Sequence, residues 1–136
     1  MYMTLIKNAD MSATLAYQVA RIVFAQTGAR TLFGVEALTC MIKNISEKYG
    51  RTIEDIIQDK NIFDALDDKS ARHYRMTEPA NSRGFQMCVR TASRMLMGGL
   101  PDIVSGATRF HYSDTIPDWA MSRGYIADID GMLFYL

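Results

Sequence analysis

The fold class is decided near the end of the sequence, by the stretch Tyr125-Ile126-Ala127-Asp128-Ile129-Asp130-Gly131-Met132-Leu133-Phe134-Tyr135. Two β-prone runs flank the Asp130-Gly131 pair in this stretch. Asp-Gly is a preferred pair for a two-residue hairpin turn, because both central residues of that turn take positive φ. The stretch therefore predicts an antiparallel β-hairpin.

A second β-prone segment precedes the hairpin. Residues 106–112 are a strand candidate, and residues 117–119, which read Pro-Asp-Trp, predict a turn or a short helix. Successive side chains of a strand point to opposite faces. We therefore expect His111 to lie on the face opposite to both Phe110 and Tyr112.

Farther upstream, apolar residues recur at helical spacing in four segments, which are residues 10–27, 31–49, 52–58 and 83–97. Asp10 or Ser12 can cap the first helix, and Gly28 and Gly50 can end the first and second. Because the connection between these two helices is short, we expect a helical hairpin. Residues 59–82 are rich in charge and poor in periodicity, which predicts a long surface segment with at most short helices; such segments are often functional.

This order of elements, helices first and a small antiparallel sheet last, predicts the α+β class. The length of 136 residues suits one domain. No internal repeat, low-complexity tract or linker divides the sequence. We therefore expect a single domain over residues 1–136, with one hydrophobic core.

The composition excludes several classes of function. Lys and Arg number 15 and Asp and Glu number 15, so a formal net charge of zero gives no general attraction to nucleic acid. No apolar run approaches the roughly 18 residues of a membrane-spanning helix. Cys40 and Cys88 lie apart in predicted helices, and the histidines, His73 and His111, are dispersed. We therefore expect reduced, buried thiols and neither a metal site nor a cofactor.

Gln26 is the polar residue that ends the apolar stripe of the first predicted helix. A buried amide must find hydrogen-bond partners. One interpretation is a core glutamine whose polar atoms are satisfied. The other is that the end of this helix forms the floor of a cleft and presents Gln26 to a ligand.

The last third of the chain is dense in aromatic residues, which are Phe110, Tyr112, Trp119, Phe134 and Tyr135. Aromatic faces beside amides and carboxylates suit a sugar-binding groove. The same side chains are also needed for the core of a small sheet. A lone histidine such as His111 is typical of a structural or hydrogen-bonding residue, and a catalytic role is the alternative.

Three groups of residues together resemble the cell wall hydrolase family of the spore cortex-lytic enzymes, over roughly residues 15–136. The family's first motif reads approximately Val-Tyr-Ala-Glu-Ala-Arg-Gly-Glu, followed by a glycine and a helix that ends in Asn-Arg. Its second motif is Gly-Ala-x-x-Phe-His, followed by Pro-x-Trp-Ala and a final Phe-Tyr. The matching positions here are Val23-Phe24-Ala25-Gln26, Gly34, Asn44, Gly106-Ala107-Thr108-Arg109-Phe110-His111, Pro117-Asp118-Trp119-Ala120 and Phe134-Tyr135.

The resemblance implies a lysozyme-like domain that cuts the glycan strand of peptidoglycan between N-acetylmuramic acid and N-acetylglucosamine. In such enzymes a single Glu at the end of the first helix acts as general acid and then as base, giving a 1,6-anhydro product. An apolar wall suits this task because it raises the pKa of a carboxyl group. By this resemblance we expect position 26 to be catalytic and the substrate to be bound by Asn44, Phe110, His111, Tyr112 and Trp119.

The sequence departs from the family at the catalytic position, where Gln26 replaces the acid. Three explanations stay open: an isosteric inactivation, a natural binding homologue that has lost catalysis, or another carboxylate that serves instead. Glu36 is the nearest alternative, although its helical position predicts a solvated face. Asp102 and Asp118 are further carboxylates near motif residues. The second class of function is thus a catalytically inactive peptidoglycan-binding or scaffold protein.

The expected place of action is the cell wall, in the periplasm or outside the cell. The first residues lack the basic and then apolar pattern of a secretory signal. Delivery would then use a holin, a phage particle or another export route, unless the sequence is a trimmed domain. The sequence leaves the oligomeric state open.

Overall fold

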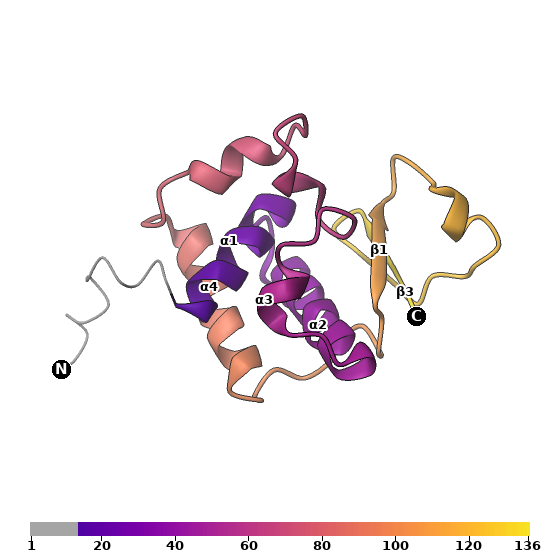
Figure 1. Cartoon of the computed structure of the whole chain (residues 1–136), viewed down its shortest axis with the longest axis horizontal. Coiled ribbons are helices and arrows are strands. Elements are labelled where there is room, and N and C mark those ends of the chain that lie inside the picture. Colours follow the sequence, from indigo (N-terminus) through magenta and orange to yellow (C-terminus); the bar gives the residue numbers. More distant parts are fainter. Residues whose placement is uncertain (1–13) are drawn as a thin grey trace.

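The computed structural model describes residues 14–136 and confirms the α+β class, with helices first and a small sheet last. In Figure 1 the helices form one side of the molecule and the strands form the other. The elements are α1 (Leu15–Thr27), α2 (Leu32–Tyr49), α3 (Ile53–Ile56), the 3₁₀ helices η3 (Asp64–Leu66) and η4 (His73–Thr77), α4 (Arg83–Leu96), β1 (Arg109–Tyr112), the 3₁₀ helix η5 (Asp118–Ala120), β2 (Ala127–Ile129) and β3 (Met132–Tyr135).

Local capping explains where the helices begin and end. Thr14 is extended, and its side chain accepts a hydrogen bond from the Tyr17 amide at 3.2 Å, so α1 begins later than the predicted position 10. The expected caps at positions 10 and 12 lie outside the described residues. Gly28 and Gly50 end α1 and α2 in the left-handed conformation, as predicted, because glycine has no Cβ to oppose positive φ.

The predicted long segment between α3 and α4 contains only η3 and η4, which confirms that it holds at most short helices. It crosses the upper side of the molecule in Figure 1, above α1. Its apolar anchors are Phe63 and Ala65, both fully buried. These anchors attach the segment to the core, while the charged residues around them stay near the surface.

The core joins the helices to one another. Helix α1 contacts α2, as the predicted hairpin requires, but its most extensive contact is with α4. Phe85 of α4 is fully buried and lies against Tyr17 and Phe24 of α1, with ring centroids 5.2 and 5.5 Å apart respectively. This packing fixes the direction of α1, and therefore the place where its last turn ends.

The predicted hairpin is confirmed. Strands β2 and β3 pair antiparallel, and the turn residues Asp130 and Gly131 have φ of 54° and 77°. Strand β1 pairs with the other edge of β3, which gives the sheet order β1-β3-β2. The strand predicted over 106–112 begins only at Arg109, because Gly106 takes a φ of 85° and turns the chain before it.

A close contact joins the hairpin turn of the sheet to α2. The Thr31 hydroxyl, which caps α2, donates a hydrogen bond of 2.6 Å to Asp130 in the hairpin turn. Gly34 lies beneath this contact, and a Cβ at that position would overlap the Asp130 carboxylate. A side chain at position 34, the glycine that the family resemblance singled out, would therefore displace the Asp130 carboxylate from its bond with Thr31.

Two further expectations concern the cysteines and membrane segments. Cys40 and Cys88 are free and buried, as predicted. Burial raises the pKa of Cys88 to about 12, so this thiol stays protonated and unreactive. Within the part of the chain that the structure describes, no helix is long and apolar enough to cross a membrane.

Candidate active site

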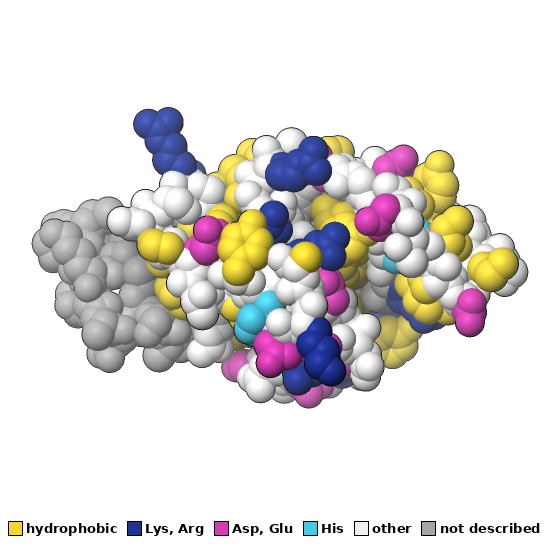
Figure 2. All heavy atoms as spheres, turned by 90° about the horizontal axis from the view of Figure 1, so that it is seen from above, with side chains coloured by type: hydrophobic (Ala, Val, Ile, Leu, Met, Phe, Trp, Pro, Cys, Tyr) yellow, Lys and Arg dark blue, Asp and Glu magenta, His cyan; other side chains and the backbone are white. Residues whose placement is uncertain are grey.

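Three cavities of about 150, 340 and 100 Å³ lie beside β1 and share lining residues, and we refer to them together as the groove. Arg72 and Tyr112 line both the first and the second cavity, and Asn61 and Phe110 line both the second and the third. Figure 2 shows Lys and Arg side chains gathered near the middle of the molecule's upper face.

Gln26 lies in the wall of the first cavity, at the end of α1. Its side-chain amide nitrogen donates hydrogen bonds to Asp64 at 2.8 Å and to the Tyr112 hydroxyl at 2.6 Å. Its side-chain oxygen accepts a bond of 2.8 Å from the backbone amide of Ala65. Gln26 is 2% exposed, and these partners use both amide hydrogens as well as the oxygen.

These contacts bear on both interpretations of Gln26. Its polar atoms are satisfied, as in a core glutamine, and the residue also lines a cavity. The bonds connect the end of α1 to η3 and to β1, which are 38 and 86 residues away in the chain. The amide therefore holds together the three elements that meet at the centre of the groove.

Asp64 is the carboxylate that the fold brings to Gln26. Besides the bond from Gln26, it accepts hydrogen bonds from the Ser70 hydroxyl at 2.6 Å and from the Arg72 guanidinium at 3.1 Å. Burial by itself would raise the pKa of Asp64, but the bonds from Ser70 and Gln26 and the charge of Arg72 together hold it below its usual range. Asp64 is therefore ionised near neutral pH and suits proton acceptance rather than proton donation.

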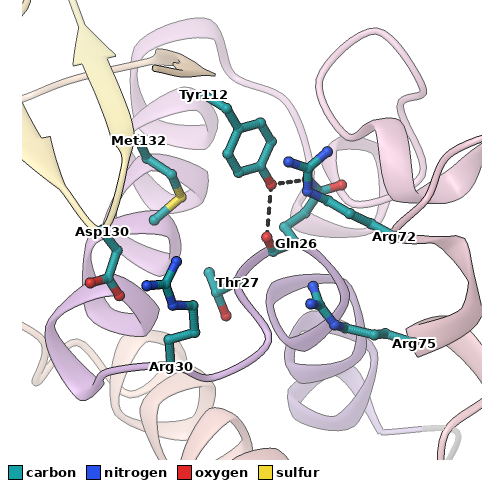
Figure 3. Close-up of a pocket in the computed structure, with 8 residues that line it drawn as sticks. All are labelled: Gln26, Thr27, Arg30, Arg72, Arg75, Tyr112, Asp130 and Met132. Carbon is teal, nitrogen blue, oxygen red and sulfur yellow. Dashed lines mark hydrogen bonds between the residues drawn. The ribbon is translucent and has the colours of Figure 1, made fainter. Parts of the chain in front are cut away.

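Tyr112 completes the centre of the groove. Its hydroxyl donates a hydrogen bond of 2.7 Å to the backbone oxygen of Gln26 (Figure 3). Burial raises the pKa of Tyr112 to about 12, so the phenol keeps its proton. The Arg72 guanidinium lies over the ring, with Cζ 3.6 Å from the centroid. Arg72 thus contacts both Asp64 and Tyr112 and fixes their relative positions.

The strand alternation places His111 on the other face of β1, as predicted. Its Nδ1 is bonded to the Tyr112 backbone oxygen and its Nε2 to the Tyr135 hydroxyl, at 2.8 and 2.7 Å. Its ring stacks on Tyr135 and meets Trp119 edge-on. His111 borders the second cavity, but both of its nitrogens are already used by these bonds.

Two of the aromatic residues expected to bind substrate line the far part of the groove. Phe110 borders the second and third cavities, and Trp119 borders the third. The Arg109 guanidinium lies over the Trp119 ring, with Cζ 3.9 Å from the centroid. The groove therefore has an aromatic end at Trp119 and a polar end at Gln26.

Other predicted residues lie away from this groove. The Asn44 amide donates to Asp102 and to the backbone oxygen of Ala107, so it braces the loop before β1. Glu36 lies 3.1 Å from Arg94 of α4, with 18% of its side chain exposed, rather than on the freely solvated face expected for it. None of the three cavities is lined by Asn44, Glu36, Asp102 or Asp118.

The structure adds site residues that the sequence did not single out: Arg30, Asp64, Arg72, Arg75 and Asp130. Three of them belong to the charged, aperiodic 59–82 segment, whose length was the only sequence signal of a functional role.

Within the described residues, no group of three or more His, Cys, Asp or Glu side chains could hold a metal ion.

The low pKa of Asp64 makes a prediction about stability. A carboxyl whose pKa is lower in the folded than in the unfolded state stabilises the fold above its unfolded pKa of about 3.9. That contribution is lost as the pH falls through the folded value. We expect Asp64→Asn to lower the free energy of unfolding at neutral pH, and the difference from the unsubstituted chain to shrink as the pH falls below the unfolded pKa of about 3.9.

Urea unfolding at several pH values measures this difference. Asp68→Asn is the matched control, because Asp68 is an exposed neighbour in the same segment. The control should follow the unsubstituted chain over the whole range. A loss of stability in Asp64→Asn that is equally large at acid and neutral pH would contradict the proposed charge interactions.

The comparisons with known proteins give one match. The family model described as Cell Wall Hydrolase matches residues 37–135, which extend from α2 to the last strand and include β1 and the 59–82 segment. Position 26 lies before the matched region. Neither the curated proteins nor the solved structures contain a significant match. Because the match covers well over half of the chain, the chain belongs to the cell wall hydrolase family.

Proposed function

We propose that this chain acts on the glycan strand of peptidoglycan as a lysozyme-like muramidase or lytic transglycosylase, with the scissile bond beside Gln26. Membership of the cell wall hydrolase family supports action on the wall in general. The single observation that carries the finer proposal is the groove along β1, in which the end of α1 meets the Asp64 carboxylate.

The shape and lining of the groove fit a chain of sugars. Three cavities in a row provide space for successive saccharide units, and the aromatic surfaces of Phe110 and Trp119 suit the apolar faces of sugar rings. Lys60, Asn61 and Thr115 add polar groups for hydroxyls and acetamido groups. A glycan strand would then run along β1 toward Gln26.

Cleavage at this place needs a proton donor and a proton acceptor. In the transglycosylase reaction the donor protonates the glycosidic oxygen, the C1–O bond breaks, and N-acetylglucosamine leaves as an alcohol. The muramyl 6-hydroxyl bonds to C1, and its proton passes to the carboxylate that gave up the first one. In the muramidase reaction a water takes the place of the 6-hydroxyl.

The side chains at the groove centre supply only part of this machinery. Asp64 is ionised and can accept a proton, whereas the Gln26 amide has no acidic proton to give. The phenol of Tyr112 is a poor acid because burial raises its pKa to about 12. We therefore expect the chain as it stands to bind its substrate strongly but to cleave it slowly.

The alternative is a catalytically inactive peptidoglycan-binding or scaffold protein that uses the same groove. The hydrogen bonds of Gln26 favour it, because both amide hydrogens and the oxygen are engaged within the protein. A glutamine that connects three structural elements in this way stabilises the shape of the groove. The groove can therefore be kept for binding even if the protein does not catalyse cleavage.

Substrate binding in the groove is tested by a matched pair of substitutions. Asn61 is exposed and borders two of the cavities, whereas Asn81 is exposed and borders none of the three. Asn61→Arg places a long side chain in the groove and should weaken binding to purified peptidoglycan by about tenfold or more, a cost of about 1.4 kcal/mol. Asn81→Arg adds the same charge elsewhere and should bind as the unsubstituted chain does.

Co-sedimentation with insoluble peptidoglycan, at several protein concentrations, gives the two affinities. Equal binding by both variants would place the wall contact outside the groove. An unsubstituted chain that does not sediment with peptidoglycan would contradict the proposed function as a whole. The place of action that follows from the proposal is the cell wall, and the delivery route is a separate question.

A further inference from the structure

The cavity at the Gln26 end of the groove is lined mainly by positively charged side chains among its ionisable residues. Three arginines line it, Arg30 from the connection between α1 and α2, and Arg72 and Arg75 from the 59–82 segment. In Figure 3 their guanidinium groups approach the cavity from two sides, with Gln26 and Tyr112 between them. The remaining lining residues are Thr27, Asp130 and Met132.

The protein itself neutralises only part of this positive charge. Asp64 lies outside the cavity and pairs with Arg72. Among the residues that the structure describes, Asp130 is the one carboxylate in the lining, and it accepts a hydrogen bond from Thr31. With three guanidinium groups against these two carboxylates, the cavity keeps an excess positive charge.

The three arginines also differ in how many of their N–H groups already bind other parts of the protein. Arg75 donates to the backbone oxygen of Ala25 at 3.0 Å, and Arg72 is engaged by Asp64 and Tyr112. Arg30 is exposed and makes no hydrogen bond or ion pair with any other described residue. The N–H groups of its planar guanidinium are therefore available to a ligand.

We propose that this cavity binds a carboxylate carried by the muramic acid residue next to the scissile bond, with Arg30 as the main contact. The inference rests on the proposed function, because it assigns a part of the same strand to a part of the same groove. The cavity, at about 150 Å³, is smaller than the 300 Å³ or more of typical ligand pockets, so it suits a substituent rather than a whole saccharide. Arginine forks match the two oxygens of a carboxylate.

Two sources could supply this carboxylate. One is the lactyl group of a muramic acid whose stem peptide has been removed, which leaves a free acid. The other is an acidic residue of an attached stem peptide. The size of the cavity favours the lactyl group, and a neutral muramyl derivative would leave Arg30 without a partner.

Binding measurements with four soluble ligands distinguish these cases. They are glycan strands without stem peptides, the same strands with each lactyl acid converted to its methylamide, strands that retain stem peptides, and neutral oligomers of N-acetylglucosamine. The unsubstituted chain should bind the free-acid strands about tenfold more tightly than their amides, and this preference should weaken with added salt.

Arg30→Gln should remove most of that preference while leaving the affinity for the neutral oligomers unchanged. Because Arg30 is exposed and unpaired within the described chain, the substitution should not disturb folding. Arg90→Gln is the matched control, since Arg90 is an exposed arginine on α4 that borders none of the three groove cavities. It should keep the full preference.

The outcomes separate this inference from the proposed function. Equal affinity for acid and amide strands overturns the carboxylate site while the groove remains a glycan site. Tight, Arg30-dependent binding only of strands with stem peptides assigns the carboxylate to the peptide. If none of the four ligands binds, the proposed function fails, and the carboxylate site fails with it.

Discussion

Replacing Gln26 with Glu should raise the rate of peptidoglycan cleavage by about 10²- to 10⁴-fold, the usual contribution of general acid–base catalysis. The substitution changes one amide nitrogen to oxygen and keeps the shape of the side chain. It places a carboxyl group in the groove at the end of α1, where the family resemblance expects the acid.

The surroundings of position 26 would also give the new carboxyl a high pKa. The side-chain nitrogen of Gln26 lies 2.8 Å from the Asp64 carboxylate and is nearly inaccessible to solvent. Two carboxylates at that distance cannot both be ionised at low cost, so the pair would share one proton near neutral pH. The shared proton is available for the glycosidic oxygen, which the amide of Gln26 cannot protonate.

The measurement is digestion of purified peptidoglycan, with released muropeptides identified by mass spectrometry. Anhydro-muropeptides would establish the transglycosylase reaction, and reducing ends would establish the muramidase reaction. In the Gln26→Glu background, adding Asp64→Asn should shift the pH profile to lower pH, because the second carboxylate no longer raises the pKa of the first. Adding Glu36→Gln should change nothing, since Glu36 pairs with Arg94 outside the groove.

The possible results identify the class of the protein. If Gln26→Glu and the unsubstituted chain both bind peptidoglycan but neither cuts it, the binding or scaffold role is correct. If both cut at the same rate, position 26 is not the catalytic position. Loss of activity on Glu36→Gln would instead assign the acid to α2.

Phe85→Ala should destabilise the fold by about 3–5 kcal/mol, the range for truncating a buried phenylalanine. Phe85 is fully buried, contacts the rings of Tyr17 and Phe24, and carries the Arg21 guanidinium 4.3 Å above its ring centre. Removing the ring leaves a cavity between α1 and α4 and removes the cation–π contact. Because α1 carries Gln26, binding in the groove should weaken as well.

Urea or thermal unfolding measures this loss of stability. Phe33→Ala is the control, because Phe33 of α2 is 54% exposed and should change the free energy of unfolding by no more than about 0.5 kcal/mol. Similar effects of the two substitutions would contradict the packing of α4 on α1. A destabilised Phe85→Ala variant that binds peptidoglycan with full affinity would separate the groove from this part of the core.

The elements themselves could be predicted from sequence because their signals are local. Gly28 and Gly50 end helices by their backbone freedom alone, and the Asp130-Gly131 pair sets a turn between immediate neighbours. The alternation that separates His111 from Tyr112 depends only on the geometry of an extended chain. In each case the deciding residues lie within a few positions of each other.

The site could be predicted only in part. The sequence pointed to Gln26, because a polar residue that ends an apolar stripe is visible as a break in the pattern. It gave no reason to choose Asp64 among the many charged residues of the 59–82 segment. Asn44 matched a family motif, yet its amide contacts the loop before β1 rather than the groove.

The sequence by itself determined the order of the helices and the C-terminal hairpin, and it pointed to position 26 as a candidate site residue. Only the tertiary structure decided the partners of that position, since Asp64 and Tyr112 are 38 and 86 residues away in the chain. It also gathered Arg30, Arg72 and Arg75 around one cavity. Secondary structure follows from short-range backbone preferences, whereas the hydrogen bonds of a buried amide and the charge of a cavity depend on which distant segments the folded core brings together.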